Sequence, residues 1–294
     1  MASYTFKNFQ IHYPDDEACL AQLMFTKFGG TETTCPACGV VKAKFHPMQT
    51  RKAYACQECG HHIYPCAGTI FHKSSTPLTK WFFAMYLMTS TRHGVAAKEL
   101  ERQLGVTYKT AWRMAHQLRK LMARADYVGP LSGHVEIDET AMGGEQKQHD
   151  RRERGTNKTI VMGMVERNGR IIAGPIPDAS LFTIDKIVRE NVEKGATIST
   201  DEWRSYNRLS DDYNHNKVIH SKKEYVRGIV HTNTIEGHWS HFKRAVLGTH
   251  VHISSKHMWK YVSEFSYRRN YRQSHSLMFS RLVEAFSLPR LADG

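Results

Sequence analysis

Residues 231–244, HTNTIEGHWSHFKR, form the stretch around which the second half of the chain is organised. Apolar residues recur in it at the spacing of one helix face, which predicts a helix docked on a core. They are Ile235, Trp239, Phe242 and Val246. A neighbouring stripe carries Glu236 and Lys243, which a helical rise places roughly 10 Å apart along the axis. A carboxylate and a cation therefore share one face at a fixed separation.

Glu236 has two interpretations. With Asn233 as the N-cap, Glu236 is at N3, where it would serve only as the second half of a capping box. As one of several carboxylates gathered from different elements, it would instead belong to a chemical site. The helix alone leaves both interpretations open. Two acidic residues upstream, Asp138 and Asp201, each expected at a strand end, favour the site.

The segment GHVEIDETAMGG, residues 133–144, predicts the first strand of this half of the chain. Val135 and Ile137 face one side of that strand. Glu136 and Asp138 face the other side, with Asp138 near the strand end.

The order of the elements that follow predicts the fold class. Two apolar strands flank Asn168-Gly169, a strong hairpin signal, and a helix is expected over about 183–193. A short strand, ATIST, then delivers Asp201, and a short helix, a strand (NKVIHS) and the helix of 231–244 follow. This is the order of a ribonuclease-H-like α/β fold, whose site gathers carboxylates from the first strand, the end of the fourth strand and a late helix. The residues in those places are Asp138, Asp201 and Glu236.

Length and charge limit the function classes. The chain has 294 residues and is 40% hydrophobic, enough for about two domains with buried cores. Its 41 Lys and Arg against 28 Asp and Glu give a net charge of +13, so the expected partner is a polyanion. Charge alone does not separate DNA from a membrane surface. The sequence has no run of about 18 apolar residues and no signal peptide, so we expect a cytoplasmic protein with no membrane partner.

Four of the six cysteines form two CxxC pairs, CPAC and CQEC. Their spacing predicts one structural Zn²⁺ held by Cys35, Cys38, Cys56 and Cys59, and four thiolates leave no open position for catalysis. Redox pairs are the alternative. Cys66 lies near enough in the chain to replace one ligand, so the identity of the fourth ligand stays open.

Three helices are predicted next, over residues 76–90, 95–105 and 107–125. The last two, joined by a turn that contains Gly105, match a helix-turn-helix motif, and Thr107 is placed to cap the second of them. Base edges or phosphates would be reached from Thr107, Tyr108, Lys109, Thr110 and Arg113. A plain three-helix bundle with a solvated basic face is the alternative.

The remaining segments are a helix, a loop and a tail. Residues 14–28 predict a short helix, and residues 143–158, polar and basic without apolar periodicity, predict a mobile loop. The tail from Ser254 predicts a basic aromatic helix with its apolar side inward. Further candidate phosphate contacts are Arg244, Arg268 and Arg269.

The predicted architecture is a multidomain α+β chain. Its parts are an N-terminal helical segment (1–30), a zinc ribbon (31–72), a helix-turn-helix DNA-binding domain (73–128), a ribonuclease-H-like catalytic domain (129–250) and a C-terminal basic helical tail (251–294).

The three acids suit phosphoryl transfer. This reaction must neutralise charge on the scissile phosphate and activate a weak nucleophile. Two Mg²⁺ or Mn²⁺ ions about 3.5–4 Å apart do both, and such hard cations prefer carboxylate oxygens. The expected magnesium ligands are Asp138, Asp201 and Glu236, with Asp138 bridging. Lys243 would contact a DNA phosphate as a point charge.

The chain resembles the DDE transposases of the ISXO2-like (IS1595) bacterial insertion-sequence family over about residues 15–275. The resemblance is carried by CPAC and CQEC, AGTIFHKSSTPLTKW, LGVTYKTAW, VEIDETAMGG, STDEW, HTNTIEGHWSHFKR and EFSYRRNYR. By that resemblance the DDE acids are Asp138, Asp201 and Glu236, and Lys243 matches the basic residue that often follows them. Some relatives have Asn at the third position, so Asn233 stays an alternative to Glu236.

The resemblance implies a function on double-stranded DNA. A protein of this family binds the terminal inverted repeats of its insertion sequence, cleaves strands and joins 3′-hydroxyl ends to target DNA, as a homodimer or higher oligomer that is nucleoid-associated when bound. Two other classes stay open: a transposase-derived DNA-binding regulator without catalysis, and a ribonuclease-H-like nuclease that cuts without joining. The three acids and Lys243 argue against the regulator, and the dedicated DNA-reading domain argues against the nuclease.

Overall fold

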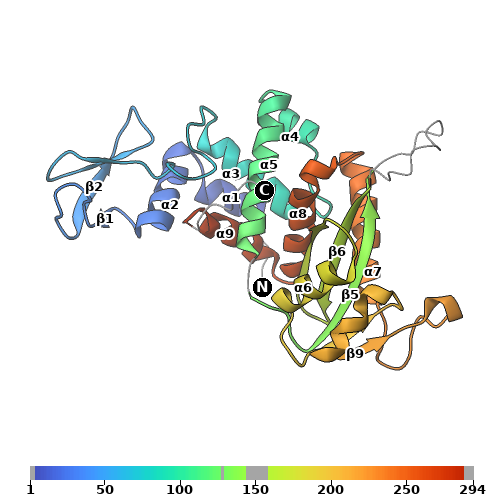
Figure 1. The fold of residues 1–294 in the computed structure, drawn as a ribbon. Coiled ribbons are helices and arrows are strands. Elements are labelled where there is room, and N and C mark those ends of the chain that lie inside the picture. The colour runs from blue at the N-terminus through green and yellow to red at the C-terminus, as the bar shows by residue number, and fades with distance from the viewer. Residues whose placement is uncertain (1–3, 127–128, 144–157, 288–294) are drawn as a thin grey trace. The chain divides into compact units, whose positions relative to one another are not determined.

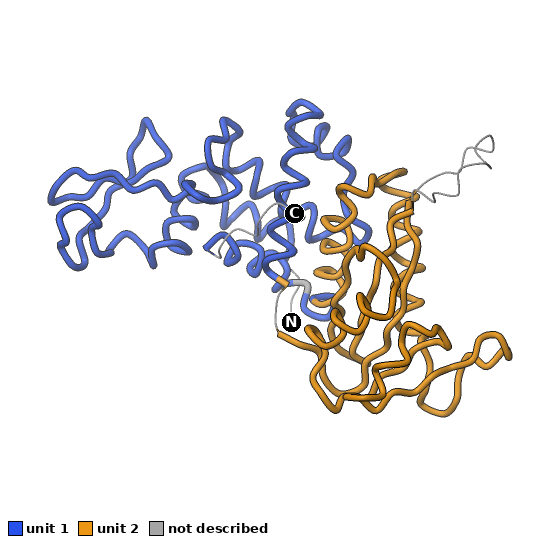
Figure 2. The backbone as a smooth tube through the Cα atoms, viewed as in Figure 1, with its two compact units in different colours: residues 1–125, 271–294 blue, residues 126–270 orange. Residues whose placement is uncertain are grey.

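The computed structural model describes residues 4–126, 129–143 and 158–287. The chain forms two compact units, residues 1–125 with 271–294 and residues 126–270 (Figure 2). Both units contain helices and strands, so the chain is of mixed α+β content. The loop predicted over 143–158 lies, apart from its two ends, outside the described residues. No helix in the described part of the chain is long and apolar enough to cross a bilayer.

The first unit combines a small antiparallel sheet with helices (Figure 1). Its described helices are α1 (Phe6–His12), α2 (Asp16–Phe28), α3 (Leu78–Ser90), α4 (Ala97–Leu104), α5 (Tyr108–Ala125), α9 (His275–Glu284) and a 3₁₀ turn, η5 (Ala285–Ser287). Its strands are β1 (Glu32–Thr33), β2 (Ala43–Pro47), β3 (Tyr54–Cys56) and β4 (His62–Ile63), paired in this order.

The three helices predicted between residues 76 and 125 are α3, α4 and α5. Gly105 ends α4 in the left-handed region at φ 57°, which glycine adopts without strain. Thr107 then caps α5, because its hydroxyl oxygen accepts a hydrogen bond of 3.3 Å from the Thr110 N–H. The helices enclose fully buried side chains, among them Trp81, Phe82, Leu100 and Leu118.

The second unit is built on one mixed sheet with the strand order β7-β6-β5-β8-β9. β5 (His134–Met142), β6 (Thr159–Glu166) and β7 (Ile171–Ile176) are antiparallel, as the Asn168-Gly169 hairpin predicts. β8 (Thr197–Thr200) runs parallel to β5, and β9 (Asn214–Lys217) runs parallel to β8. The other described elements are α6 (Leu181–Asn191), α7 (Asn233–Ala245), α8 (Met258–Asn270), the 3₁₀ helices η1 (Arg204–Asp211), η2 (His220–Lys222) and η4 (Ser255–His257), and a π turn, η3 (Val246–His250).

Helices cover both faces of this sheet, and the residues of β5 alternate between the faces. Val135 and Ile137 lie in a core shared with α6 and η1. The opposite core includes Trp239 of α7 together with residues of α8. Glu136 and Asp138 lie on the α7 face, as the alternation in the sequence predicts.

Three expectations about this unit are wrong in detail. Asp138 lies in the middle of β5 and not near its end, because pairing with β6 continues to Met142. The N-cap of α7 is Thr232 and not Asn233. The strand expected over NKVIHS begins earlier and ends at Lys217, because its partner β8 is only four residues long.

Gly163 lets α7 approach the sheet closely. It lies on β6 directly opposite Asp138. A Cβ at this position would stand 2.6 Å from a ring carbon of Trp239 and 2.8 Å from Cδ1 of Ile235, both on α7. Only a residue without a side chain fits there, so the helix packs on the sheet at the level of Asp138.

Replacing Gly163 by alanine should destabilise the second unit. The added methyl group would force Trp239 or the whole helix to move, and overpacking of this kind costs about 1–3 kcal/mol. Gly174→Ala is the matched control, since a Cβ at Gly174 on β7 meets no heavy atom of the described chain within 4 Å. Thermal unfolding should show a lower midpoint for Gly163→Ala only. Equal midpoints for both variants would contradict the close packing of α7.

Candidate active site

Asp138 and Asp201 are brought together by two parallel strands. β5 and β8 pair in register up to Glu136 with Ser199. Continued by two residues, this register places Asp138 beside Asp201, the first residue after β8. Both side chains are half-buried. Two acids from distant stretches of sequence therefore meet where β8 ends.

The turn after β8 holds the carboxylate of Asp201. Its Oδ1 accepts a hydrogen bond of 2.9 Å from the Trp203 N–H. Next to it, the Glu202 carboxylate accepts from the N–H groups of His220 and Ser221 at 2.8 and 2.9 Å, which ties the turn to η2. A pocket of about 340 Å³ opens here, and Trp203, 55% exposed, lines it. A substrate can therefore reach Asp201 from solvent.

Glu236 and Lys243 lie on the exposed face of α7, as the helical spacing predicts. Oε1 of Glu236 accepts a hydrogen bond of 2.6 Å from the Thr232 hydroxyl. The capping-box interpretation is wrong, because a capping-box glutamate accepts from the backbone N–H of the N-cap residue, and no such bond is made among the described residues. Asn233, the alternative third ligand, is the first residue of α7 and is also exposed.

The three acids form one electrostatic cluster. Burial, and then the charges of neighbouring carboxylates, raise the pKa of Asp138 to about 7. Those neighbours are Glu139, Asp201 and Glu236. Burial also raises the pKa of Asp201, and Glu202 and Glu236 act in the same direction. Strand register brings Asp138 and Asp201 together, and the charge of Glu236 acts on the pKa of both, so the three predicted acids influence one another's ionisation.

Glu139 is a further acid whose charge acts on Asp138, and the sequence patterns did not point to it. Its carboxylate accepts a hydrogen bond from the buried hydroxyl of Tyr206 on η1. Burial raises the pKa of Glu139, while the hydrogen bond from Tyr206 acts against that shift. The available signal was its place next to Asp138, but alternation along β5 points it to the opposite face of the sheet.

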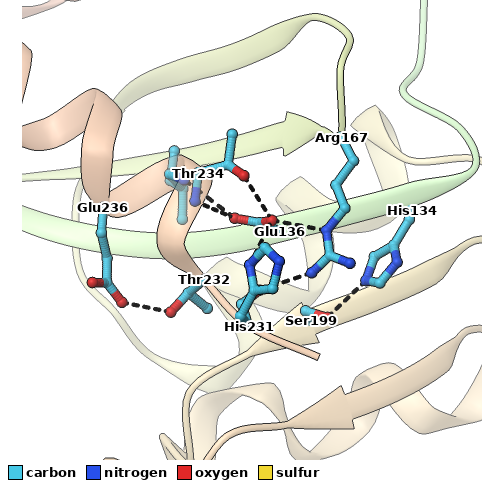
Figure 3. A network of polar contacts seen from close by, with 9 residues as sticks. His134, Glu136, Arg167, Ser199, His231, Thr232, Thr234 and Glu236 are labelled. Atoms are coloured by element: carbon cyan, nitrogen blue, oxygen red, sulfur yellow. Dashed lines mark hydrogen bonds and ion pairs between the residues drawn. The ribbon is translucent and has the colours of Figure 1, made fainter. Parts of the chain in front are cut away.

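Glu136 is a second missed acid, and it lies in the interior. Its side chain is 0% exposed. Figure 3 shows the carboxylate between Thr234 at the start of α7 and the guanidinium of Arg167, with the His231 ring alongside. The alternation of Glu136 with Asp138 was visible in the sequence, whereas its burial was not.

The four cysteines predicted to bind zinc come together in the first unit. Their sulfur atoms all lie within 4.8 Å of one another, and Sγ of Cys35 is 3.7 Å from Sγ of Cys59. Thiolates about 2.3 Å from a tetrahedral Zn²⁺ stand about 3.8 Å apart, so the arrangement fits a structural ion. The members are Cys35, Cys38, Cys56 and Cys59. Cys66 is buried and is not a member.

No three carboxylates among the described residues of the second unit come as close together as these sulfurs. Within the described part of the chain, the cysteine group is the only set of three or more His, Cys, Asp or Glu whose ligand atoms all lie within 4.8 Å.

Most of the residues predicted to face DNA lie exposed on the first turns of α5. The exposed ones are Thr107, Tyr108, Lys109 and Arg113, and Thr110 is half-buried. The guanidinium of Arg113 donates to the Ser74 hydroxyl at 3.3 Å and lies 5.8 Å from the ring centre of Trp81. These contacts orient Arg113 along the surface of its own unit.

The basic residues proposed as phosphate contacts in the second unit are placed differently. Arg244 is exposed on α7, and Arg269 is half-buried on α8. Arg268 is buried, and its guanidinium donates to Glu264 at 2.8 Å within α8. A guanidinium committed to a buried ion pair cannot bind a phosphate as well, so the prediction for Arg268 is wrong. The tail predicted as one helix from Ser254 is instead α8 and α9, with a turn between them.

Two segments of the chain match known families. Residues 130–270 match the family described as ISXO2-like transposase domain. Residues 14–62 match the family described as transposase zinc-ribbon domain. Residues 130–270 are therefore similar to the ISXO2-like transposase domain. A Halobacterium salinarum protein, described as an uncharacterized protein in transposable element ISH50, is 29% identical over 254 residues, which are 80% of this chain and 84% of that protein. The resemblance drawn from the sequence motifs is thus confirmed. The ISXO2-like segment contains Asp138, Asp201 and Glu236.

Metal analysis tests the cysteine group of the zinc ribbon. We expect about one Zn²⁺ per chain, and Cys56→Ser should lose the ion because three thiolates do not complete the tetrahedron. Cys66→Ala is the control and should keep the zinc, since Cys66 lies outside the group. Elemental analysis of the purified variants measures both. A full complement of zinc in Cys56→Ser would contradict the assignment.

The raised pKa of Asp138 predicts a pH-dependent stability. That pKa is about 7 in the folded chain against an ordinary value of 3.8. The folded state therefore holds more protons than the unfolded state, and stability falls as the pH rises between these two values. Asp138→Asn removes this titration. Without added Mg²⁺ or Mn²⁺, its melting midpoint should exceed that of wild type by more at pH 8 than at pH 5. A difference that stays constant with pH would show that neither burial nor the neighbouring charges raise the pKa of Asp138.

Proposed function

We propose that this chain is a DNA transposase that cleaves strands at the ends of an insertion sequence and joins 3′-hydroxyl ends to target DNA. The observation that carries the proposal is the convergence of three acids from β5, the end of β8 and α7. They are Asp138, Asp201 and Glu236. The matched transposase domain and the relative in a transposable element support it. The strand order β7-β6-β5-β8-β9 supports a ribonuclease-H-like fold for residues 126–270.

The donor set of this site suits two Mg²⁺ or Mn²⁺ ions. The carboxylates near Asp138 raise its pKa because no cation among the described residues offsets their negative charge. Hard divalent cations prefer carboxylate oxygens as ligands, so they suit such a group. Asp138 is proposed as the shared ligand, since its pKa responds to both Asp201 and Glu236. When bound, such ions neutralise charge on the scissile phosphate and activate the attacking water or 3′-hydroxyl.

The cationic residues on α7 are proposed to hold the DNA at this site. Lys243 is exposed two helical turns beyond Glu236, and Arg244 is exposed next to it. Each offers a charge to a backbone phosphate, which positions the strand without reading its sequence. The net charge of +13 supports a long polyanion as the partner.

The first unit is proposed to read the terminal inverted repeats. The order of α4, the turn at Gly105 and α5 supports a helix-turn-helix, in which the exposed side chains of Tyr108 and Lys109 would enter a major groove. The zinc ribbon would stabilise this DNA-binding part. We expect a homodimer or higher oligomer on DNA, because an element has two ends.

Two variants on α7 test the proposal. Glu236→Gln keeps size and helix but removes a charge that a hard cation needs, so cleavage and joining should both fall on the order of 100-fold while repeat binding survives. Lys243→Ala removes one exposed charge, so activity should fall less and should fall further as salt rises. The measurement is a Mg²⁺-dependent cleavage and strand-transfer assay on a duplex taken from the DNA that flanks the reading frame.

The outcomes separate the competing functions. Near wild-type cleavage by Glu236→Gln would remove Glu236 from the site and direct attention to Asn233. Repeat binding by the wild-type chain without any cleavage would favour a regulator. Cleavage without joining would favour a nuclease.

A further inference from the structure

Glu136 is an acid at the site that the proposed chemistry leaves unused. It lies on β5 two residues before Asp138, on the same face of the sheet. Because its side chain is completely buried, its charge destabilises the fold unless cations and hydrogen-bond donors compensate it. The compensating groups come from two places, the start of α7 and the turn between β6 and β7.

The first set of contacts joins Glu136 to the start of α7. Its Oε2 accepts hydrogen bonds from the N–H groups of Thr234 at 2.7 Å and Ile235 at 3.3 Å. Its Oε1 accepts from the Thr234 hydroxyl at 2.9 Å. The first N–H groups of a helix have no partner within the helix, and they form its positive end. Glu136 therefore caps α7 from another element of the fold.

The second set of contacts fixes the carboxylate itself. Arg167 donates from Nε to Oε1 of Glu136 at 2.9 Å and from Nη2 to the carbonyl oxygen of His231 at 3.3 Å. Nδ1 of His231 lies 3.2 Å from the same Oε1 (Figure 3). Arg167 thus holds both the carboxylate and the backbone that leads into α7.

These contacts set the positions of two of the three acids relative to each other. Asp138 follows Glu136 by two strand residues, roughly 7 Å along β5. Glu236 lies in the first turn of α7, whose N–H groups Glu136 holds, and it accepts from the hydroxyl of Thr232 at 2.6 Å. Any shift of the start of α7 along β5 would change the separation of Asp138 and Glu236.

Resting on the proposed function, we propose that Glu136 is a positioning residue of the metal site. Its buried carboxylate fixes the start of α7 against β5 and so sets the distance between the carboxylates of Asp138 and Glu236. Glu136 acts through these two residues and binds neither metal nor DNA itself.

A purely structural ion pair is the alternative, and the same unit offers a matched control for it. Glu264 on α8 is also 0% exposed and is also paired with an arginine, since Arg268 donates to it at 2.8 Å. The main causes that shift the pKa of Asp138 and Asp201 do not include Glu264. Removing its charge disturbs a buried ion pair within α8, whereas the contacts of Glu136 are made to the start of α7.

The test is the affinity of the full-length, zinc-loaded chain for Mn²⁺ without DNA, measured by electron paramagnetic resonance well below the unfolding midpoints. Glu136→Gln should weaken Mn²⁺ binding about 10- to 100-fold, the usual effect of losing a group that orients metal ligands. Glu264→Gln should lower the unfolding midpoint and leave the Mn²⁺ affinity at the wild-type value. Equal Mn²⁺ affinities for Glu136→Gln and wild type would overturn the inference.

Asp138→Asn separates this inference from the proposed function. If Asp138→Asn binds Mn²⁺ as wild type does, the proposed metal site itself is wrong. If Asp138→Asn loses Mn²⁺ and Glu136→Gln keeps it, the site stands and the positioning role of Glu136 fails.

A second pair of variants tests the same inference in case Glu136→Gln does not fold. Thr234→Val removes only the hydroxyl that donates to Glu136 and should weaken Mn²⁺ binding less than Glu136→Gln would. Thr234→Ser keeps that hydroxyl and should restore the wild-type affinity. Wild-type Mn²⁺ binding by Thr234→Val would count against the positioning role.

Discussion

The second unit depends on the contact between a buried carboxylate on β5 and the positive end of α7. Glu136 has no access to water, so its charge needs partners within the fold. Arg167, on the turn after β6, and the first N–H groups of α7 supply them, which requires the sheet, this turn and the helix to meet in one arrangement. Gly163 makes that arrangement sterically possible, because a Cβ there would lie 2.6 Å from Trp239. The position of Glu236 relative to Asp138 follows from these two constraints.

The acids of the site work against the stability of the fold that holds them. Burial and the charges of neighbouring carboxylates raise the pKa values of Asp138 and Asp201, so ionising them in the folded chain is unfavourable. The apolar cores on the two faces of the sheet supply the stability that offsets this strain. Such a balance is expected where function requires like charges to stand close together.

The first unit meets a different constraint, the small size of its sheet. Strands β1 to β4 contain between two and five residues, too few to bury a core of their own. The cysteine group at this sheet allows one ion to link the two CxxC turns. Metal binding and folding of this segment are therefore expected to be coupled.

Local patterns in the chain were sufficient to find the zinc ligands, the Asn168-Gly169 hairpin and the polar face of α7, because each depends on residues close together in sequence or on ligand spacing. The place of Asp138 within its strand was not predictable in this way, since strand length is set by pairing with β6. The same holds for the carboxylate that accepts from the first N–H groups of α7, because it belongs to Glu136 on β5. Burial separates Glu136 and Arg268 from the exposed charges around them, and only packing against distant elements decides which charged side chains lose contact with water.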